Sequence, residues 1–326
     1  MKNTEFKVIT GAAGFIGSHT CEKMLNNGYR VLGIDNLNDY YDPLLKQHNL
    51  NSLKRFDNFK FIQADICDYN ALFELFQDHS LDTIIHLAAQ AGVRYSIENP
   101  FIYQQVNVGG TLNLLELARH FNIKNFVFAS SSSVYGNQQK VPFSEDTPFL
   151  RPVSIYAATK QAGETLCYSY HHLYGININC LRLFTVYGPA GRPDMSPHIF
   201  TKKVLKEETI QLFDDSLGAI KRDFTYVSDI VDGILKASDH HSGFQIFNLG
   251  HGSPIKLRDF LGIIEELTGK TATIEHTHCQ PGDVAVTYAD ITKAKKQLGF
   301  QSKVSIREGL ERFVDWFVKY YNVQQR

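Results

Sequence analysis

The chain has 326 residues, 43% of them hydrophobic, and its 33 basic and 34 acidic side chains leave a net charge of -1. This length suffices for one large domain or two joined ones. The balanced charge offers no electrostatic reason to expect nucleic acid or a membrane surface as partner, and no apolar run approaches a membrane span. The five cysteines are scattered without a C-x-x-C pair, which favours buried thiols in a reducing cytoplasm.

The first expected strand, residues 6–10, begins too early for a signal peptide to precede it. It runs into a glycine-rich turn with the spacing G-x-x-G-x-x-G, and apolar residues at helical spacing follow to Asn27. A strand, such a turn and a helix start form an anion site, because backbone N–H groups point at a pyrophosphate that glycine allows to come close. The alternative is a tight turn with close helix packing. The residues expected to bind a dinucleotide here are Gly11, Gly14, Phe15, Ile16 and Gly17.

Acidic residues end the next two expected strands. Strand 30–34 leads to Asp35 and Asn36, and a carboxylate at Asp35 would accept hydrogen bonds from the ribose hydroxyls and repel a 2′-phosphate. This favours NAD over NADP, with a turn or helix cap as the alternative. Strand 59–62 is followed by Asp65 and Ile66, where Asp65 could reach the adenine amine or cap the helix that begins nearby.

Small residues follow the strand expected at 82–87, so a cofactor's ribose and phosphates can approach the backbone there. The expected cofactor contacts are Leu87, Ala88 and Ala89. Arg94 lies just beyond and could meet a phosphate or a carboxylate, or be solvated.

A long helical segment is expected at residues 100–122. It contains Asn107, which must find hydrogen-bond partners within an apolar face. We count Asn107 among the cofactor residues, while its alternative role is to hold neighbouring strand ends together.

Four serines at 130–133 follow the strand expected at 125–129. The carboxyl end of a parallel strand is where open α/β sheets bind ligands, and a polar low-complexity loop is the alternative.

The helix expected at 154–174 carries Tyr156 and Lys160 on one face, because they are four residues apart. A lysine cation would lower the pKa of the phenol from about 10. The phenolate could then take a proton from a sugar hydroxyl.

The rest of the chain predicts two more buried strands and a smaller domain. Strand 176–184 is followed by a turn-rich stretch at 185–194 that is typical of a domain crossing. The remaining expected elements are a helix from about 228, a strand at 245–249, helices at 257–268, 292–298 and 305–321, and a strand near 272–275. The fold class is therefore α/β: a Rossmann-type doubly wound parallel sheet with a smaller α/β substrate-binding domain. The cluster from His276 to Cys279 alternates like a strand end, and no metal is expected.

Together with the glycine turn, the serine run and the Tyr156/Lys160 pair, further motifs make the chain resemble the extended short-chain dehydrogenase/reductase family over essentially its whole length. More narrowly, it is similar to the nucleotide-sugar 4-epimerases, and most of all to those that act on UDP-glucuronate. The narrower match rests on residues 35–42, 184–189, 191–195 and 280–284. The resemblance implies an NAD-binding domain at 1–185 plus 222–250, and a nucleotide-sugar-binding domain at 186–221 plus 251–326.

The resemblance also implies roles for single residues. Tyr156 is the base that takes the O4 proton, Lys160 is its partner and touches the nicotinamide ribose, and Ser131 hydrogen-bonds the sugar O4. Arg222 stands at a position associated with the UDP pyrophosphate, and Asp283 lies near the uridine pocket. Tightly bound NAD takes hydride from C4 and returns it to the opposite face of a transient 4-keto sugar, so UDP-glucuronate becomes UDP-galacturonate.

The uronate carboxylate needs donors, because a 4-keto sugar with a carboxylate on C5 is a β-keto acid that loses carbon dioxide readily. The expected donors are Ser131, Ser132, Ser133, Thr185 and Arg192. Related decarboxylases usually carry an acid where this chain has Ser133. The alternative for Arg192 is a salt bridge with Asp194. Ala190 stands where relatives often carry tryptophan, which would remove bulk beside the sugar.

Three other functions stay open. The first is 4-epimerisation of neutral sugars, UDP-glucose or UDP-N-acetylglucosamine; the second is UDP-glucuronate decarboxylation, which Ser133 disfavours. The third is an NAD-binding sensor without catalysis, although such proteins tend to lose the tyrosine or the lysine. A homodimer through helices 100–122 and 154–174 is a further implication of the resemblance.

Overall fold

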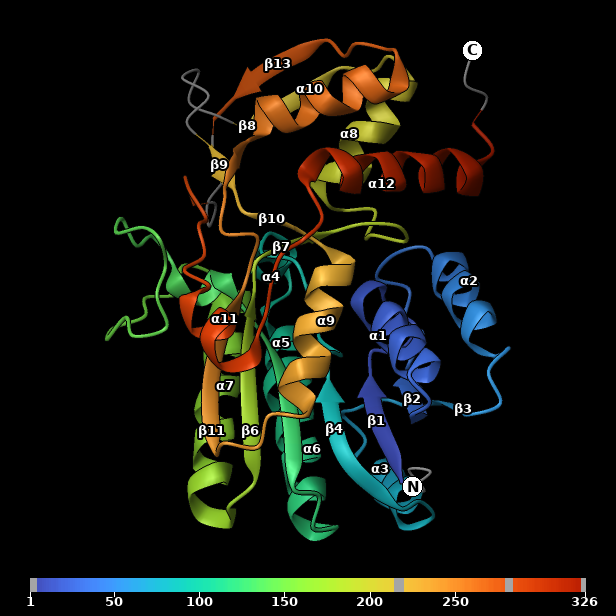
Figure 1. Cartoon of the computed structure of the whole chain (residues 1–326), viewed down its shortest axis with the longest axis vertical. Coiled ribbons are helices and arrows are strands. Elements are labelled where there is room, and N and C mark those ends of the chain that lie inside the picture. Colours follow the sequence, from blue (N-terminus) through green and yellow to red (C-terminus); the bar gives the residue numbers. More distant parts are fainter. Residues whose placement is uncertain (1–4, 214–219, 279–283, 324–326) are drawn as a thin grey trace.

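Seven parallel strands form one sheet in the larger part of the molecule. The computed structural model describes residues 5–213, 220–278 and 284–323 (Figure 1). The strands are β1 (Phe6–Thr10), β2 (Arg30–Asp35), β3 (Phe59–Gln63), β4 (Leu81–His86), β5 (Asn125–Ser131), β6 (Asn177–Leu183) and β11 (Phe244–Leu249). Their order is β11-β6-β5-β4-β1-β2-β3, with every neighbouring pair parallel. The Rossmann-type sheet is thus confirmed, and its order reverses between β1 and β4, where such sheets bind ligands.

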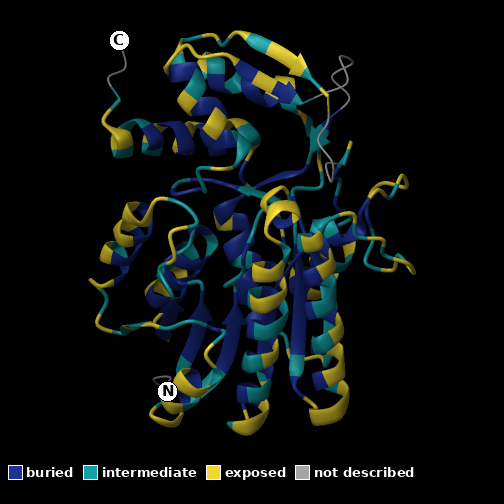
Figure 2. Ribbon diagram, turned by 180° about the vertical axis from the view of Figure 1, so that it is seen from behind, coloured by how far each residue is buried: buried dark blue, intermediate teal, exposed yellow. Residues whose placement is uncertain are grey.

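Alternate residues of each strand enter two hydrophobic clusters, one on each face of the sheet. In β1, Ile9 belongs to one cluster and Val8 to the other, and β4 repeats the pattern with Ile85 and Ile84. This follows from the period of two in a strand that is covered on both faces. Figure 2 shows the strands buried and the outer turns of the helices exposed.

Helices cover both faces (Figure 1). The helices α1 (Phe15–Asn26) and α9 (Val227–Ser238) cover the first face, with α2 (Pro43–Leu53) beside α1. The second face is covered by α3 (Tyr69–Gln77), α6 (Thr111–His120) and α7 (Ile155–Tyr174).

The segment expected as one helix at 100–122 is interrupted. It consists of α5 (Pro100–Tyr103), a π-helical stretch η1 (Gln104–Gly110) and α6, and it is preceded by the short helix α4 (Tyr95–Glu98). The two glycines at 109–110 weaken regular helix propensity, and single-turn π-helices often occur at functional sites. Asn107 lies in this stretch.

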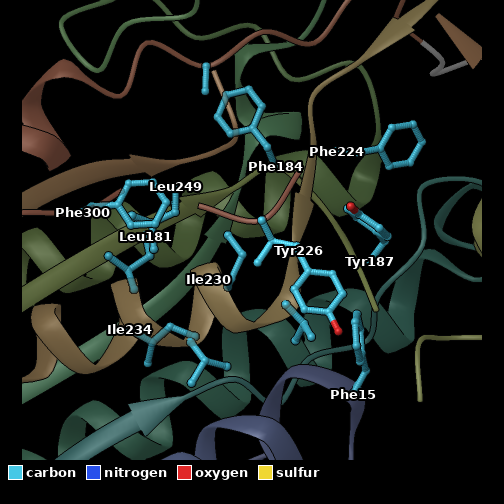
Figure 3. Close-up of a cluster of buried hydrophobic side chains, with 14 of the residues drawn as sticks. Phe15, Leu181, Phe184, Tyr187, Phe224, Tyr226, Ile230, Ile234, Leu249 and Phe300 are labelled. Atoms are coloured by element: carbon cyan, nitrogen blue, oxygen red, sulfur yellow. The ribbon is translucent and has the colours of Figure 1, made fainter. Parts of the chain in front are cut away.

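The stretch at 185–194 is also not all turn. It begins with a short strand, β7 (Thr185–Tyr187), which pairs in parallel with β10 (Phe224–Tyr226). The rings of Phe224 and Tyr187 both contact Phe260 of the smaller part of the molecule. Figure 3 shows Tyr187, Phe224 and Tyr226 in one hydrophobic cluster with Phe15 of α1. The crossing between the two parts of the molecule is therefore packed, because its side chains are apolar and buried.

The smaller part is α/β, as the sequence predicts, and lies at the carboxyl ends of the sheet strands (Figure 1). It contains α8 (Ser196–Leu205), α10 (Leu257–Thr268) and α12 (Ile306–Tyr321), a parallel pair β8 (Ile210–Phe213) and β13 (Ile274–Thr277), and an antiparallel pair β9 (Lys221–Arg222) and β12 (Ile255–Lys256). The helix α11 (Thr292–Leu298) instead packs beside β11. Within the described ranges, no helix has the length and apolar character needed to cross a membrane.

Candidate active site

A cleft of about 820 Å³ lies between the carboxyl ends of the sheet strands and the smaller part of the molecule. Nearly all residues predicted to bind a cofactor or substrate line it. These are Gly11, Gly14, Phe15, Ile16, Gly17, Asp35, Asn36, Asp65, Ile66, Leu87, Ala88, Ala89, Arg94, Ser131, Ser132, Ser133, Tyr156, Lys160, Thr185, Arg192 and Arg222. Asn107 does not line the cleft, and Asp283 lies outside the described residues.

The glycine-rich turn presents the start of α1 to the cleft. A Cβ added to Gly17 would lie 1.9 Å from the Gly11 carbonyl oxygen, so the turn needs glycine there. At the N-cap, Gly14 provides no side-chain hydrogen bond, and the first turn holds no acidic residue. The backbone N–H groups at this helix start are therefore suited to bind a phosphate, which fits the pyrophosphate of a dinucleotide.

Asp35 forms the turn contacts that are the alternative to its predicted ribose contact. Its carboxylate accepts hydrogen bonds from Ala13 N at 3.1 Å and from Leu37 N at 2.9 Å, so it holds the glycine-rich turn against the end of β2. It also lines the cleft. Each carboxylate oxygen has a further lone pair, which leaves acceptors for ribose hydroxyls.

Asp65 does not cap α3, so that alternative is wrong. The cap is Asp68, which accepts from Ala71 N at 3.0 Å. Asp65 instead accepts from the Asn36 side chain at 3.0 Å and from Cys67 N at 2.8 Å. Burial raises the pKa of Asp65, but these hydrogen bonds outweigh it and the pKa lies below its usual value. An ionised acceptor thus remains at the cleft.

Asn107 lies behind the cleft wall, which corrects its placement among the cofactor contacts. Its side chain pairs with both backbone groups of Gln90, at 2.8 and 3.0 Å, and its amide also donates to the Thr159 hydroxyl at 3.0 Å. Because Thr159 in turn donates to the carbonyl of Tyr156 at 2.9 Å, Asn107 connects the loop after β4 to the first turn of α7. This is close to the alternative role, that of holding neighbouring strand ends.

A second buried contact supports the same loop. The ring of His86 lies between the hydroxyls of Thr10, 2.8 Å from Nδ1, and Thr111, 3.0 Å from Nε2. Thr111 donates its only proton to the Asn107 carbonyl at 2.6 Å, so Nε2 of His86 must be the protonated nitrogen. Burial, with a smaller effect from the Lys160 charge, lowers the pKa of His86 to about 3. The imidazole is therefore neutral.

Tyr156 and Lys160 stand on α7 where the sequence places them, but their electrostatics differ from the prediction. Lys160 is 3% exposed and donates to the Ala129 carbonyl at 2.8 Å, and burial lowers its pKa to about 8. Burial raises the pKa of Tyr156, while the Ser131 hydroxyl and the Arg192 charge oppose that rise. The expectation of a lowered phenol pKa is thus wrong for the protein alone, because desolvation disfavours the phenolate.

The side chains of the serine run point in two directions at the end of β5. Ser130 turns into the protein and donates to Glu164 at 2.5 Å, which also forms a buried two-point ion pair with Arg182. Ser131 begins the 3₁₀ turn η2 (Ser132–Tyr135), accepts from Ser133 N at 3.1 Å and lies 3.1 Å from the Ser133 hydroxyl. The hydroxyls of Ser131 and Ser133 therefore lie together at the cleft.

Arg192 lines the cleft and forms the salt bridge with Asp194 that is the alternative to its predicted carboxylate contact. Its Nε and Nη2 donate to the two oxygens of Asp194 at 3.0 and 2.5 Å. The Tyr40 hydroxyl donates to the same carboxylate at 3.3 Å. Sequence reasoning gave Tyr40 no place in the site and named Asp194 only as the alternative salt-bridge partner of Arg192. A signal for Tyr40 was present, since it belongs to the 35–42 motif that carried the resemblance.

The remaining predicted positions surround the far part of the cleft. The guanidinium of Arg94 stacks 4.3 Å from the ring of Phe213, on the opposite side of the cleft in β8. Arg222 donates to the carbonyls of Lys221 and Ala285, at 3.0 and 3.1 Å. Ala190 is buried with a left-handed backbone, φ 58°, and does not line the cleft, so its small size does not widen the sugar side.

The cysteine and histidine side chains of the described residues form no metal site or disulfide. No group of three or more His, Cys, Asp or Glu side chains there is placed to hold a metal ion. The four cysteines within those ranges are free thiols, and Cys279 lies outside them.

Comparisons with known proteins find relatives over nearly the whole chain. Residues 8–313 match the family model described as GDP-mannose 4,6 dehydratase. A UDP-glucuronate 4-epimerase of Thermodesulfobacterium geofontis is 50% identical over 312 residues, which cover 95% of each chain. The crystal structure of UDP-glucuronic acid 4-epimerase from Bacillus cereus, in complex with UDP-glucuronic acid and NAD, is 38% identical with a TM-score of 0.91, and covers 97% of this chain and 100% of its own. UDP-glucose 4-epimerase from Thermotoga maritima with UDP-glucose is 33% identical with a TM-score of 0.88, and covers 97% and 99%.

Proposed function

Because this chain belongs to the extended short-chain dehydrogenase/reductase family, within the group that the GDP-mannose 4,6-dehydratase model describes, we propose that it is an NAD-dependent 4-epimerase of UDP-glucuronate. The product is UDP-galacturonate. The single observation that carries the choice of substrate is Arg192, whose guanidinium lines the same cleft as the base Tyr156 and opposes the rise that burial causes in that residue's pKa.

The cofactor part of the cleft fits NAD. The uncapped start of α1 receives the pyrophosphate, and Asp35 receives the adenine-side ribose. A carboxylate at this position repels the 2′-phosphate of NADP. When bound, NAD supplies the acceptor and donor of the C4 hydride.

The protein's own part in the reaction is the movement of one proton and the positioning of the sugar. Tyr156 takes the O4 proton as the C4 hydride leaves, and returns it after the 4-keto sugar has turned over within the cleft. Ser131 holds O4, and the Lys160 ammonium favours the phenolate. The Lys160 ammonium is held in place by its hydrogen bond to the Ala129 carbonyl.

The carboxylate of the sugar meets several donors at one end of the cleft. Ser132, Ser133 and Thr185 line it together with Arg192, and a guanidinium matches the geometry of a carboxylate. Ser133 offers no carboxylate for acid or base work at C5. These features favour epimerisation of the uronate over its decarboxylation.

A neutral UDP-hexose is the second candidate substrate, and the likeness to the UDP-glucose 4-epimerase from Thermotoga maritima favours it. The test is to incubate the purified protein with UDP-glucuronate and with UDP-glucose in separate reactions and to identify the products. Formation of UDP-galacturonate supports the proposal. Turnover of UDP-glucose alone overturns the choice of the uronate, and UDP-xylose would mean decarboxylation.

We further propose that the chain forms a homodimer in the cytoplasm. The surface formed by 95–120 and α7 exposes large apolar side chains, among them Phe101 at 86%. The others include Ile97, Leu112, Ile155 and Tyr168. Burying such a patch against a second copy is favourable, and the free thiols fit a reducing compartment. Sedimentation of wild type and Phe101→Asp tests the dimer: wild type is expected at twice the chain mass and the variant at a shifted, lower mass.

The division into an NAD-binding domain at 1–185 plus 222–250 and a UDP-sugar-binding domain at 186–221 plus 251–326 is part of the same proposal. Arg222 on β9 and the uridine pocket near Asp283 would hold the UDP group while the sugar turns. Saturation-transfer measurements with UDP alone would test whether this group carries most of the binding.

A further inference from the structure

We propose that Asp194 is a positioning residue that fixes the Arg192 guanidinium. The guanidinium then holds the substrate carboxylate away from the orientation in which the C5–C6 bond can break to release carbon dioxide. Asp194 thereby determines whether the 4-keto uronate is reduced back to an epimer or loses carbon dioxide. This inference rests on the proposed function.

The contact between the two side chains is a two-point one. Nε and Nη2 of Arg192 each donate to one oxygen of Asp194, at 3.0 and 2.5 Å. A guanidinium carries five N–H donors in a rigid plane, so this contact uses two and fixes the plane of the other three. Because Arg192 lines the cleft, the remaining donors have a defined direction when a ligand carboxylate arrives.

The pair is braced from the other part of the molecule. Tyr40, in the loop after β2, donates its hydroxyl to Asp194 at 3.3 Å, and its ring lies 5.8 Å from the Arg192 guanidinium. The chain at Gly92 passes just beside them: a Cβ there would lie 2.6 Å from the Tyr40 hydroxyl and 3.6 Å from Nη2 of Arg192. Gly92 has φ +102°, a conformation that side chains rarely adopt. Three loops far apart in sequence thus meet around one ion pair.

The electrostatics of this arrangement point to orientation and not to affinity. Asp194 already neutralises much of the Arg192 charge, and a second carboxylate from the sugar would meet some repulsion from it. An arginine used only to attract an anion would bind more tightly without such a partner. The ion pair therefore weakens the attraction of Arg192 for the substrate carboxylate, but it fixes the plane of the guanidinium. The chemistry of the substrate gives a reason for such a fixed plane.

That chemical reason is the side reaction of the 4-keto uronate. When the C5–C6 bond stands perpendicular to the plane of the C4 carbonyl, it can break and pass its electron pair into the carbonyl to form an enolate. Carbon dioxide leaves, and a proton adds at C5 to give a UDP-4-keto-pentose. A guanidinium that holds the carboxylate near the carbonyl plane slows this step, whereas a mobile one does not.

The experiment compares wild type with Asp194→Asn, Asp194→Ala and Tyr40→Phe. Each is incubated with UDP-glucuronate labelled with ¹³C at the carboxyl group, and labelled carbon dioxide and UDP-galacturonate are measured together with kcat and KM. Glu98→Gln is the matched control, because Glu98 is an exposed acid at the edge of the cleft and, within the described residues, forms no hydrogen bond or ion pair with Arg192. Tyr40→Phe removes one hydroxyl only and keeps the test decisive if an Asp194 variant does not fold.

We expect the ratio of carbon dioxide to epimer to rise about tenfold or more in the Asp194 variants, and by a smaller factor in Tyr40→Phe. KM for UDP-glucuronate should stay level or fall, and Glu98→Gln should match wild type. An unchanged ratio with a lower kcat, or a higher KM with an unchanged ratio, overturns the inference. Wild-type protein that does not epimerise UDP-glucuronate would instead overturn the proposed function, and the inference with it.

Discussion

The Lys160 ammonium donates a hydrogen bond to the carbonyl oxygen of Ala129 at 2.8 Å. This contact joins the first turns of α7 to β5 at the carboxyl edge of the sheet, and it holds a buried cation one helical turn from the phenol of Tyr156, with no carboxylate of the described residues paired to it. Because burial lowers the pKa of Lys160 to about 8, the charge that favours the phenolate is present below about pH 8 and is lost above it.

The pH dependence of the reaction should therefore level off at alkaline pH. We expect kcat/KM to rise with pH as more of Tyr156 loses its proton, since burial raises its pKa, and to stop rising above about pH 8, where loss of the Lys160 charge offsets the gain in phenolate. A pH–rate profile of wild type beside Lys160→Met checks this. The variant should be much slower and should keep rising above about pH 8; a profile that levels off at the same pH in Lys160→Met would assign the break to another group.

Removing the phenol of Tyr156 should remove the chemistry and leave the fold. In Tyr156→Phe, turnover of UDP-glucuronate is expected to fall by about 10²- to 10⁴-fold, the usual contribution of a positioned acid or base. The amount of NAD bound per chain should not change, since the glycine-rich turn and Asp35 are untouched. Tyr168→Phe, on an exposed face of the same helix, is the control. Full activity in Tyr156→Phe would mean that another group moves the O4 proton.

Arg192 should matter for the uronate and not for a neutral hexose. Arg192→Leu is expected to raise KM for UDP-glucuronate by about 10- to 100-fold, because a hydrogen-bonded charge contributes about 1.5–3 kcal/mol. Any turnover of UDP-glucose by wild type should survive in the variant. Kinetics on both substrates decide the point, and an equal loss on both would show that Arg192 only supports the loop at 188–195.

Acid should destabilise the folded protein through His86. Its pKa is about 3 when folded and about 6.5 when unfolded. Between these two pH values, His86 binds a proton in the unfolded chain and not in the folded protein. Stability is therefore complete above about pH 6.5 and falls as the pH drops, by about 1.4 kcal/mol per pH unit for one proton. His198, whose pKa burial lowers to about 4, adds to the effect.

Urea unfolding at pH 5 and pH 7 measures this loss. His86→Gln keeps a donor and an acceptor but does not titrate, so its stability should change less between the two pH values than that of wild type. His172→Gln, on the exposed face of α7, should behave like wild type. Equal losses in wild type and His86→Gln would contradict the neutral imidazole between Thr10 and Thr111.

The sequence predicts the sheet, the cofactor turn and the positions of Tyr156 and Lys160 because these depend on local periodicity and fixed spacing. The division of the serine run was also within reach, since successive residues at the end of a strand point to opposite sides, and Ser130 turns away from Ser131. The capping of α3 by Asp68 is a local event as well, but two acids three residues apart leave the choice of cap open.

Other features depend on segments that meet only in three dimensions. Tyr40 and Asp194 are 154 residues apart, and no periodic pattern relates them. Asn107 faces Gln90 and Thr159 from a π-helical turn, which helical spacing does not anticipate. The pKa of Tyr156 rises because the site is dry, and that desolvation depends on the packing of both parts of the molecule.

The most direct test of the epimerase mechanism uses UDP-glucuronate carrying deuterium at C4. If the C4 hydride leaves and returns within one site, the UDP-galacturonate formed will retain the deuterium at C4, with no exchange from ordinary water and no net reduction of NAD. Loss of the deuterium to solvent, or release of carbon dioxide with UDP-xylose as the main product, would contradict it.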